Sequence, residues 1–276
     1  MKFKYVLTAA LTASIGFGLA GCSKQEKTVS ADNRDIKVVT LLTRDNPPYP
    51  QVAEYVREKV KKQNIELKIK YANDGLIPNK SVAENEVDLN YFQHKYYMRS
   101  AKELNNWDLV ALTSTFNGMF GAYSPKYKNI NDLPDKAKIV IPSDPSNGGR
   151  ALNLLARAHL IELKPNTGAK TSLKDITANP KDFQFTEVEH ALVPVSFKDA
   201  DLAIMAGAYT VHANLLPKRD SIYLEQDNQE YDSVLVSNSK AAEKPEVQAV
   251  KDAFIAEDTR EFVLKNYTDT VTWPKR

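Results

Sequence analysis

Strand-like and helix-like segments alternate from Ile36 onward, and this alternation limits the possible folds more than any other feature of the sequence. Residues 36–42 (IKVVTLL) form a nearly continuous apolar run, as expected of a strand buried on both faces of a parallel sheet. Apolar residues then recur at helical spacing over 52–60. Residues 65–71 alternate apolar with charged side chains, as a half-exposed strand does. The order strand, helix, strand predicts a βαβ unit and an α/β fold.

The rest of the chain continues the same alternation without an internal repeat or a shift in composition. We therefore expect two lobes that exchange strands, with a ligand site where loops follow the carboxyl ends of strands. The segments predicted as helices are 79–87, 95–104, 148–160 and 247–262. The segments predicted as strands are 88–92, two within 109–123, 138–141, 183–188 and 201–205.

The first 22 residues have the pattern of a bacterial lipoprotein signal. Lys2 and Lys4 precede an apolar stretch over 6–20, and small residues stand directly before Cys22. A transmembrane anchor is the alternative, but interspersed Thr, Ser and Gly dilute the stretch. We expect cleavage after residue 21 and a lipid on Cys22, so that the chain is anchored rather than spanning. Residues 22–35 are then a polar tether beside an extracytoplasmic membrane surface.

Charge and cysteine content exclude several classes of protein. The chain has 37 basic and 35 acidic side chains, and loss of the two leader lysines leaves a formally neutral mature protein. A neutral body argues against bulk electrostatic capture of nucleic acid. A lone cysteine can form neither an internal disulfide nor a multi-thiolate metal site.

One loop combines a helix start with a cation. Residues 143–150 (SDPSNGGR) form a bend before the predicted helix, which would place Arg150 in its first turn. A cation there opposes the helix dipole unless an anion binds both the free N–H groups and the guanidinium. We favour a carboxylate site over a solvated arginine.

A second loop is rich in aromatic side chains. Residues 90–97 (NYFQHKYY) carry four aromatics and His94 at a strand end. Alternation along the strand points Tyr91 and Phe92 to opposite faces, so one can pack in the core while the other faces a cleft. Core packing of both is the alternative. An aromatic wall beside an arginine suits a small amphiphile with a carboxylate.

Nothing in the sequence indicates an enzyme, a metal or a cofactor. The nucleophile-elbow, zinc-protease, Walker and dinucleotide-binding motifs are all absent. His159 and His190 stand in apolar surroundings and are expected to be packed rather than ligating. We therefore predict a protein that is not an enzyme and that holds no cofactor.

Three long segments resemble the methionine-binding lipoproteins of the NlpA family, the substrate-binding components of ABC importers. They are residues 73–98, 121–164 and 175–189, with the FQH, NDLPD and DPSNGGRAL blocks in order. The resemblance implies a two-lobed, type II-like periplasmic-binding-protein fold with a ligand cleft between the lobes. Lobe I would take residues 36–116 and 222–276, and lobe II residues 117–221. The family resemblance also implies a monomer that docks on a membrane permease.

The same resemblance assigns ligand-binding positions. Phe92 and Tyr97 match aromatics around the ligand side chain, His94 matches the histidine beside them, and Arg150 matches the arginine that holds the ligand carboxylate. Phe116 and Tyr209 fall on further pocket positions. Several polar positions of the family pattern are replaced here, by Gly75, Phe116, Gly118, Leu192, Val195, Ala206 and Ala208.

These replacements predict a roomier and more apolar cleft that has lost hydrogen bonds to an amino-acid head group. Each lost bond to a charged ammonium is worth roughly 1.5 to 3 kcal/mol. We therefore expect a larger carboxylate, such as a dipeptide or a modified amino acid, to bind better than free L-methionine. A surface lipoprotein that acts through protein contacts, with an altered or vestigial cleft, is the alternative function.

Overall fold

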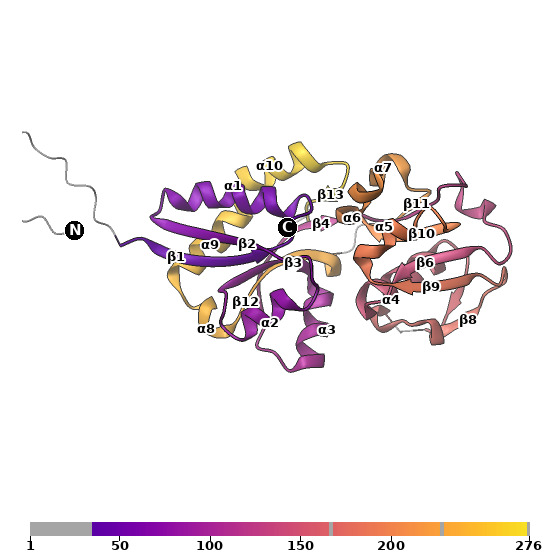
Figure 1. Ribbon diagram of the computed structural model, residues 1–276, viewed down its shortest axis with the longest axis horizontal. Coiled ribbons are helices and arrows are strands. Elements are labelled where there is room, and N and C mark those ends of the chain that lie inside the picture. The colour runs from indigo at the N-terminus through magenta and orange to yellow at the C-terminus, as the bar shows by residue number, and fades with distance from the viewer. Residues whose placement is uncertain (1–34, 166–167, 227–228, 275–276) are drawn as a thin grey trace, which may run out of the picture. The chain divides into compact units, whose positions relative to one another are not determined.

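The computed structural model describes residues 35–165, 168–226 and 229–274 (Figure 1). The predicted signal peptide, Cys22 and all of the tether except Asp35 lie outside these ranges. Residues Asp35–Arg276 form one compact unit. No helix within the described ranges has both the length and the apolar character needed to cross a membrane.

The described residues contain two large sheets of the α/β type. The first has the order β13-β4-β12-β3-β1-β2, in which β1 runs parallel to β2 and β3 while β12 runs antiparallel to β3 and β4. Its strands are β1 (Lys37–Thr43), β2 (Ile65–Tyr71), β3 (Leu89–His94), β4 (Val110–Gly118), β12 (Asp232–Ser237) and β13 (Val271–Thr272).

The second sheet has the order β11-β5-β10-β6-β9, in which β6 runs parallel to β10 and β9 while β5 is antiparallel to β10. Its strands are β5 (Phe120–Tyr123), β6 (Lys138–Pro142), β9 (Gln184–Val188), β10 (Leu202–Ala206) and β11 (Tyr223–Leu224). The short strands β7 (Glu162–Leu163) and β8 (Ile176–Ala178) pair separately.

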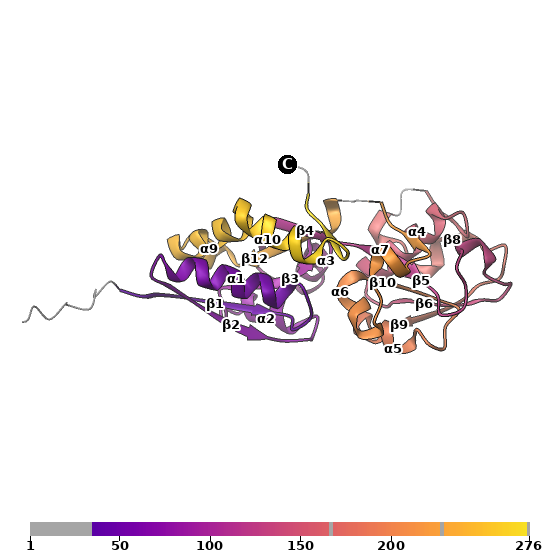
Figure 2. The same ribbon diagram turned by 90° about the horizontal axis from the view of Figure 1, so that it is seen from above.

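Helices cover both faces of the first sheet. On one face α1 (Tyr49–Lys61), α9 (Pro245–Ile255) and α10 (Glu257–Tyr267) lie side by side (Figures 1 and 2). The other face packs against α2 (Ile77–Ala83) and α3 (Lys95–Asn105). Alternation along β1 explains the arrangement, because Leu41 belongs to the core under α1 and Leu42 to the core beside α2.

The second sheet has its own core on each face. On one face it packs against α4 (Pro145–Arg157), whose leucines fill the space next to Ile139, Ile141 and Ile204. The other face packs against α5 (Val193–Ser196), and α6 (Gly207–Thr210) directly follows β10 and contributes Tyr209 to the same core. The remaining helices, α7 (Pro217–Asp220) and α8 (Ser239–Ala242), are single turns.

The structure confirms the α/β prediction and corrects several boundaries. The expected terminal helix over 247–262 is two helices, because Ala256 has extended backbone angles and acidic residues open the second helix. Lobe I was expected to end at 116 and resume at 222, yet β4 continues to Gly118 and β11 pairs with β5 in the second sheet. Turn and cap geometry, rather than hydrophobic pattern, sets these limits.

Candidate ligand-binding site

A pocket of about 120 Å³ lies where strand ends of the two sheets meet, large enough for several water molecules. Each main part of its lining follows a strand at its carboxyl end. Arg44 follows β1, and Phe92 and His94 end β3 in the first sheet. The second sheet contributes the residues after β6, β9 and β10. The lining residues are Arg44, Tyr49, Asn73, Gly75, Phe92, Gln93, His94, Tyr97, Ser143, Asp144, Asn147, Glu189, His190, Ala191, Ala206, Ala208 and Tyr209.

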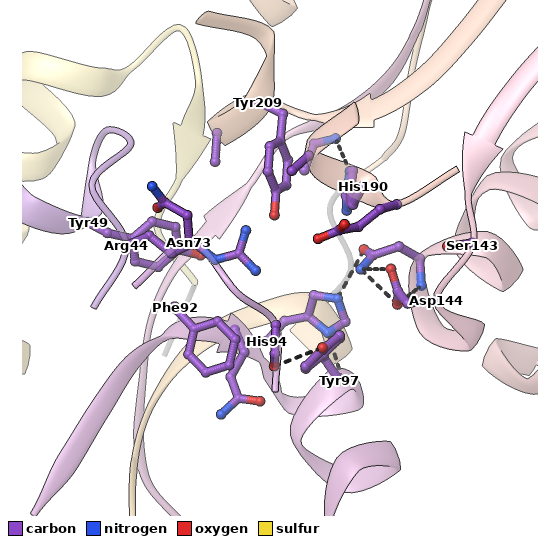
Figure 3. Close-up of a pocket in the computed structure, with 17 residues that line it drawn as sticks. Arg44, Tyr49, Asn73, Phe92, His94, Tyr97, Ser143, Asp144, His190 and Tyr209 are labelled. Carbon is purple, nitrogen blue, oxygen red and sulfur yellow. Dashed lines mark hydrogen bonds between the residues drawn. The ribbon is translucent and has the colours of Figure 1, made fainter. Parts of the chain in front are cut away.

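Arg44 brings a positive charge into the middle of this pocket (Figure 3). Its guanidinium carbon lies 5.2 Å from the ring centre of Phe92 and 5.2 Å from that of Tyr209. The Nε atom is buried and has no hydrogen-bond partner among the described residues. Burial lowers the pKa of Arg44, while nearby groups including Asp144 and Glu189 raise it. Two aromatic rings therefore hold a guanidinium whose hydrogen bonds remain to be made.

Four residues expected to bind ligand do line the pocket, namely Phe92, His94, Tyr97 and Tyr209. Phe92 and Tyr97 meet edge to face with ring centres 6.0 Å apart. Tyr97 lies in the first turn of α3, where its backbone N–H donates to Nδ1 of the N-cap residue His94 at 3.1 Å. The strand end and the helix start thus fix both rings of this wall.

Two histidines, buried His190 and half-buried His94, line the pocket in a form that resists protonation. Burial, with a smaller contribution from the Arg150 charge, lowers the pKa of His94 to about 3. Burial and the charges of Arg44 and Arg150 lower the pKa of His190 well below its ordinary value. The packed state expected for His190 is confirmed, whereas His159 is exposed after the end of α4. Both pocket histidines are therefore neutral at physiological pH.

The N-terminus of α4 is already capped by a carboxylate of the chain itself. Asp144 is the N-cap, and its Oδ1 accepts hydrogen bonds from the backbone N–H of Asn147 and from Ser146 Oγ. Proline at the first helical position favours this start, three residues earlier than predicted. Asn147 Oδ1 then lies 3.2 Å from His94 Nε2 across the two sheets. The expected anion site on free N–H groups is occupied by Asp144.

Arg150 lies outside the pocket lining, in the second turn of α4 rather than the first. Its Nε donates to Glu225 Oε2 at 2.7 Å, and both side chains are only 3% exposed. The guanidinium carbon lies 4.4 Å from the ring centre of Phe120 and 4.0 Å from that of Tyr231. A buried carboxylate of the chain therefore fills the role that we expected of a ligand.

Phe116 also lies outside the pocket lining. It is 1% exposed in the core of the first sheet, with ring centres 5.2 Å from Tyr49 and 6.0 Å from Tyr91. Alternation along β4 places this position on the face that packs against α1 and α9. The family resemblance implied a pocket position for Phe116, but the structure places its side chain in the core.

The positions at which polar residues of the family pattern are replaced also divide into those that line the pocket and those that do not. Gly75, Ala206 and Ala208 line the pocket, whereas Gly118, Leu192 and Val195 do not. A Cβ on Gly75 would lie 2.5 Å from the hydroxyl of Tyr97, which donates to the Gly75 carbonyl at 3.0 Å. Tyr97 therefore uses the space that a larger side chain would need. Charged side chains, among them Arg44 and Glu189, also line the pocket.

Sequence reasoning missed two charged side chains of the pocket that have no ion-pair partner in the described part of the chain. Arg44 directly follows the first predicted strand, and Glu189 directly follows the strand that ends at Val188. Their positions at the ends of parallel strands were the available signal. Within the described ranges, no group of three or more His, Cys, Asp or Glu residues is arranged to hold a metal ion.

The two sheets, with a pocket at their facing strand ends, define a two-lobed binding protein of the α/β type. The family model for NlpA lipoproteins matches residues 45–274. The chain belongs to the NlpA lipoprotein family.

Known relatives support this placement. A probable D-methionine-binding lipoprotein MetQ of Haemophilus influenzae is 33% identical, with 98% of each chain covered. The crystal structure of lipoprotein Tp32 from Treponema pallidum has a TM-score of 0.83 at 31% identity, covering 87% of this chain and 100% of Tp32. A nutrient-binding protein of Burkholderia cenocepacia, solved with methionine bound, has a TM-score of 0.82 at 29% identity, with 86% and 100% covered.

Proposed function

We propose that this protein is the substrate-binding lipoprotein of an ABC importer and captures an amino acid or dipeptide in the pocket between its two sheets. The observation that carries the proposal is a pocket with an unpaired guanidinium, aromatic walls and contributions from both sheets. A small molecule that touches both lobes stabilises their closed arrangement, and this differential affinity drives closure. Relatives of the chain are described as methionine-binding proteins, which agrees with a ligand of the size of an amino acid.

The finer features of the proposal follow from the leader and the family. The lipid on Cys22 holds the protein at the extracytoplasmic side of a bacterial membrane, and residues 22–35 give it reach. It acts as a monomer, delivers its ligand to a membrane permease and catalyses no reaction. An open pocket with an unpaired charge supports ligand binding over a vestigial cleft, since a cleft without a ligand gains stability by losing such a charge.

Calorimetric titration of ligand-stripped protein tests the proposal. L-Methionine, D-methionine and glycyl-L-methionine are the probes, and the matched control is Ala206→Phe, which fills the pocket. We expect one-to-one binding of at least one probe to the wild type and loss of that binding in the control. Absence of heat with every probe would contradict the proposed function.

The order of affinities tests the ligand class. We expect glycyl-L-methionine to bind more tightly than free L-methionine, because small side chains at Ala191, Ala206 and Ala208 leave room along one wall. If free L-methionine were the tightest of the three probes, the preference for a larger ligand would be wrong.

A further inference from the structure

We propose that Arg44, rather than Arg150, holds the anionic group of the ligand, and that the ligand is a zwitterion whose cationic group faces Glu189. This inference rests on the proposed function and specifies the chemistry of the same pocket. It assigns a specificity-determining role to two residues at the ends of strands in different sheets.

The first step concerns which arginine is available. Arg150 does not line the pocket, and it is paired with Glu225, whose other oxygen pairs with Arg157 at 2.7 Å. Arg44 makes no ion pair with the described residues, and its buried Nε is an orphaned donor. A guanidinium recognises a planar carboxylate with two parallel hydrogen bonds, so an incoming carboxylate supplies the missing acceptors.

The second step concerns how the pocket holds that guanidinium ready. Phe92 lies in β3 of the first sheet and Tyr209 in α6, which follows β10 of the second sheet, and their ring centres lie 5.2 Å each from the same guanidinium carbon. Figure 3 shows the guanidinium between them, pointing toward the centre of the pocket. Stacking fixes the orientation of the planar group without satisfying its N–H donors. A ligand carboxylate therefore meets a charge that is already oriented, which reduces the entropy lost on binding.

The third step concerns the opposite charge. Asp144 and Glu189 both line the pocket on the side of the second sheet, and both interact electrostatically with Arg44. The oxygens of Asp144 are taken by Ser146 and Asn147. The backbone carbonyl of Glu189 accepts a hydrogen bond from Leu192, but its exposed carboxylate makes no hydrogen bond or ion pair with the described residues. It remains free for a ligand ammonium, and a zwitterion would then bridge the two sheets.

Paired acid and amide probes test the role of Arg44. The dissociation constants of L-methionine and L-methioninamide, and of glycyl-L-methionine and its C-terminal amide, are measured for the wild type, Arg44→Gln and Arg57→Gln. Arg57 is an exposed residue of α1 and serves as the matched control. We expect the wild type and the control to prefer each acid by about 10- to 100-fold, and Arg44→Gln to lose this preference.

The outcomes separate this inference from the proposed function. An acid preference that persists in Arg44→Gln would overturn the assignment of Arg44 and leave amino-acid binding intact. Failure of the wild type to bind all four probes would overturn the proposed function and the inference together. N-acetyl-L-methionine tests Glu189: Glu189→Gln is expected to weaken L-methionine about tenfold without weakening the acetylated probe, and equal effects on both would overturn that assignment.

Thermal unfolding of ligand-free protein distinguishes binding from structure. An orphaned buried charge destabilises the empty protein, so Arg44→Gln is expected to unfold at the wild-type temperature or above it. A decrease in unfolding temperature as large as that of Arg150→Gln would show that Arg44 is structural.

Discussion

Two arginines near the pocket have opposite surroundings. Arg150 lies between two aromatic rings with a buried carboxylate as its partner, while Arg44 lies between two aromatic rings without one. The first arrangement stabilises the protein itself, and the second leaves binding capacity for another molecule. The presence or absence of a carboxylate partner, rather than the aromatic rings, distinguishes the structural arginine from the ligand-binding one.

Arg150→Met is expected to destabilise the protein by about 3 kcal/mol, because it leaves buried Glu225 with only its exposed partner. Urea unfolding measures the change. Arg157→Met is the matched control: its side chain is 44% exposed, and we expect a loss below about 1 kcal/mol. Equal effects of the two substitutions would contradict the structural role of Arg150.

The lowered pKa values of the two pocket histidines predict a loss of stability in mild acid. Burial lowers the pKa of His94 to about 3 in the folded protein, so between pH 6.5 and 3 the unfolded chain binds more protons than the folded chain. The free energy of unfolding should therefore fall as the pH decreases below 6.5, by up to about 1.4 kcal/mol per pH unit for this group. Unfolding at several pH values measures the slope.

His94→Asn isolates the contribution of that residue. Asparagine retains an N-cap acceptor for α3 but does not titrate, so the slope between pH 6.5 and 4.5 should become shallower. His212→Asn, at an exposed position, is the control and should keep the wild-type slope. A slope unchanged by His94→Asn would show that His94 is not the group that titrates.

At the scale of elements, the approach of α4 to the end of β6 positions the lining of the second sheet. A Cβ on Gly148 would lie 2.7 Å from the Pro142 carbonyl oxygen, a contact with backbone that cannot relax by side-chain rotation. Glycine here lets the helix start directly after the strand, so that Asp144 and Asn147 both reach the pocket.

Gly148→Ala is expected to destabilise the protein by about 1–3 kcal/mol and to weaken ligand binding, because α4 must move away from β6. Chemical denaturation and calorimetry measure the two effects. Gly118→Ala is the control, since a Cβ there meets nothing within 4 Å. Wild-type behaviour of Gly148→Ala would contradict the tight approach.

Elements were predictable where hydrophobic pattern alone decides them. The predicted strand over 65–71 matches β2, and the predicted helix over 95–104 matches α3 to within one residue. The start of α4 was missed because a proline and an N-cap aspartate extend a helix beyond its apolar pattern. That shift of three residues moved Arg150 from the first turn to the second.

Site residues were predictable only in part for the same reason. Phe92, His94 and Tyr97 follow from a strand end and its aromatic pattern. The ion pair of Arg150 with Glu225 joins residues 75 positions apart, and no local pattern indicates such a partner. Arg44 was not predicted as a site residue because a single arginine after a strand belongs to no recognisable sequence motif.

At the scale of the whole described unit, hydrogen bonds next to the pocket join residues of the two lobes. Asn46 Nδ2 donates to the Ala208 carbonyl at 2.7 Å, and His94 approaches Asn147 at 3.2 Å. Asn46 is buried but does not line the pocket. It can therefore favour the closed arrangement without touching the ligand.

Asn46→Ala is expected to weaken binding about fivefold, because a neutral hydrogen bond that stabilises the closed form is worth about 1 kcal/mol. Surface plasmon resonance should show the change mainly in the dissociation rate. Asn105→Ala removes a hydrogen bond within α3 and is expected to bind like the wild type. Unchanged dissociation from Asn46→Ala would contradict the stabilisation of closure by this bond.

The presence of a natural ligand is the central claim, and native mass spectrometry of gently purified full-length protein tests it most directly. The native mass of the wild type should exceed its denatured mass by that of one small zwitterion, which is released and identified on unfolding. The Ala206→Phe variant should show no such difference. Equal native and denatured masses of the wild type, in protein that also fails to bind the probes, would contradict the account.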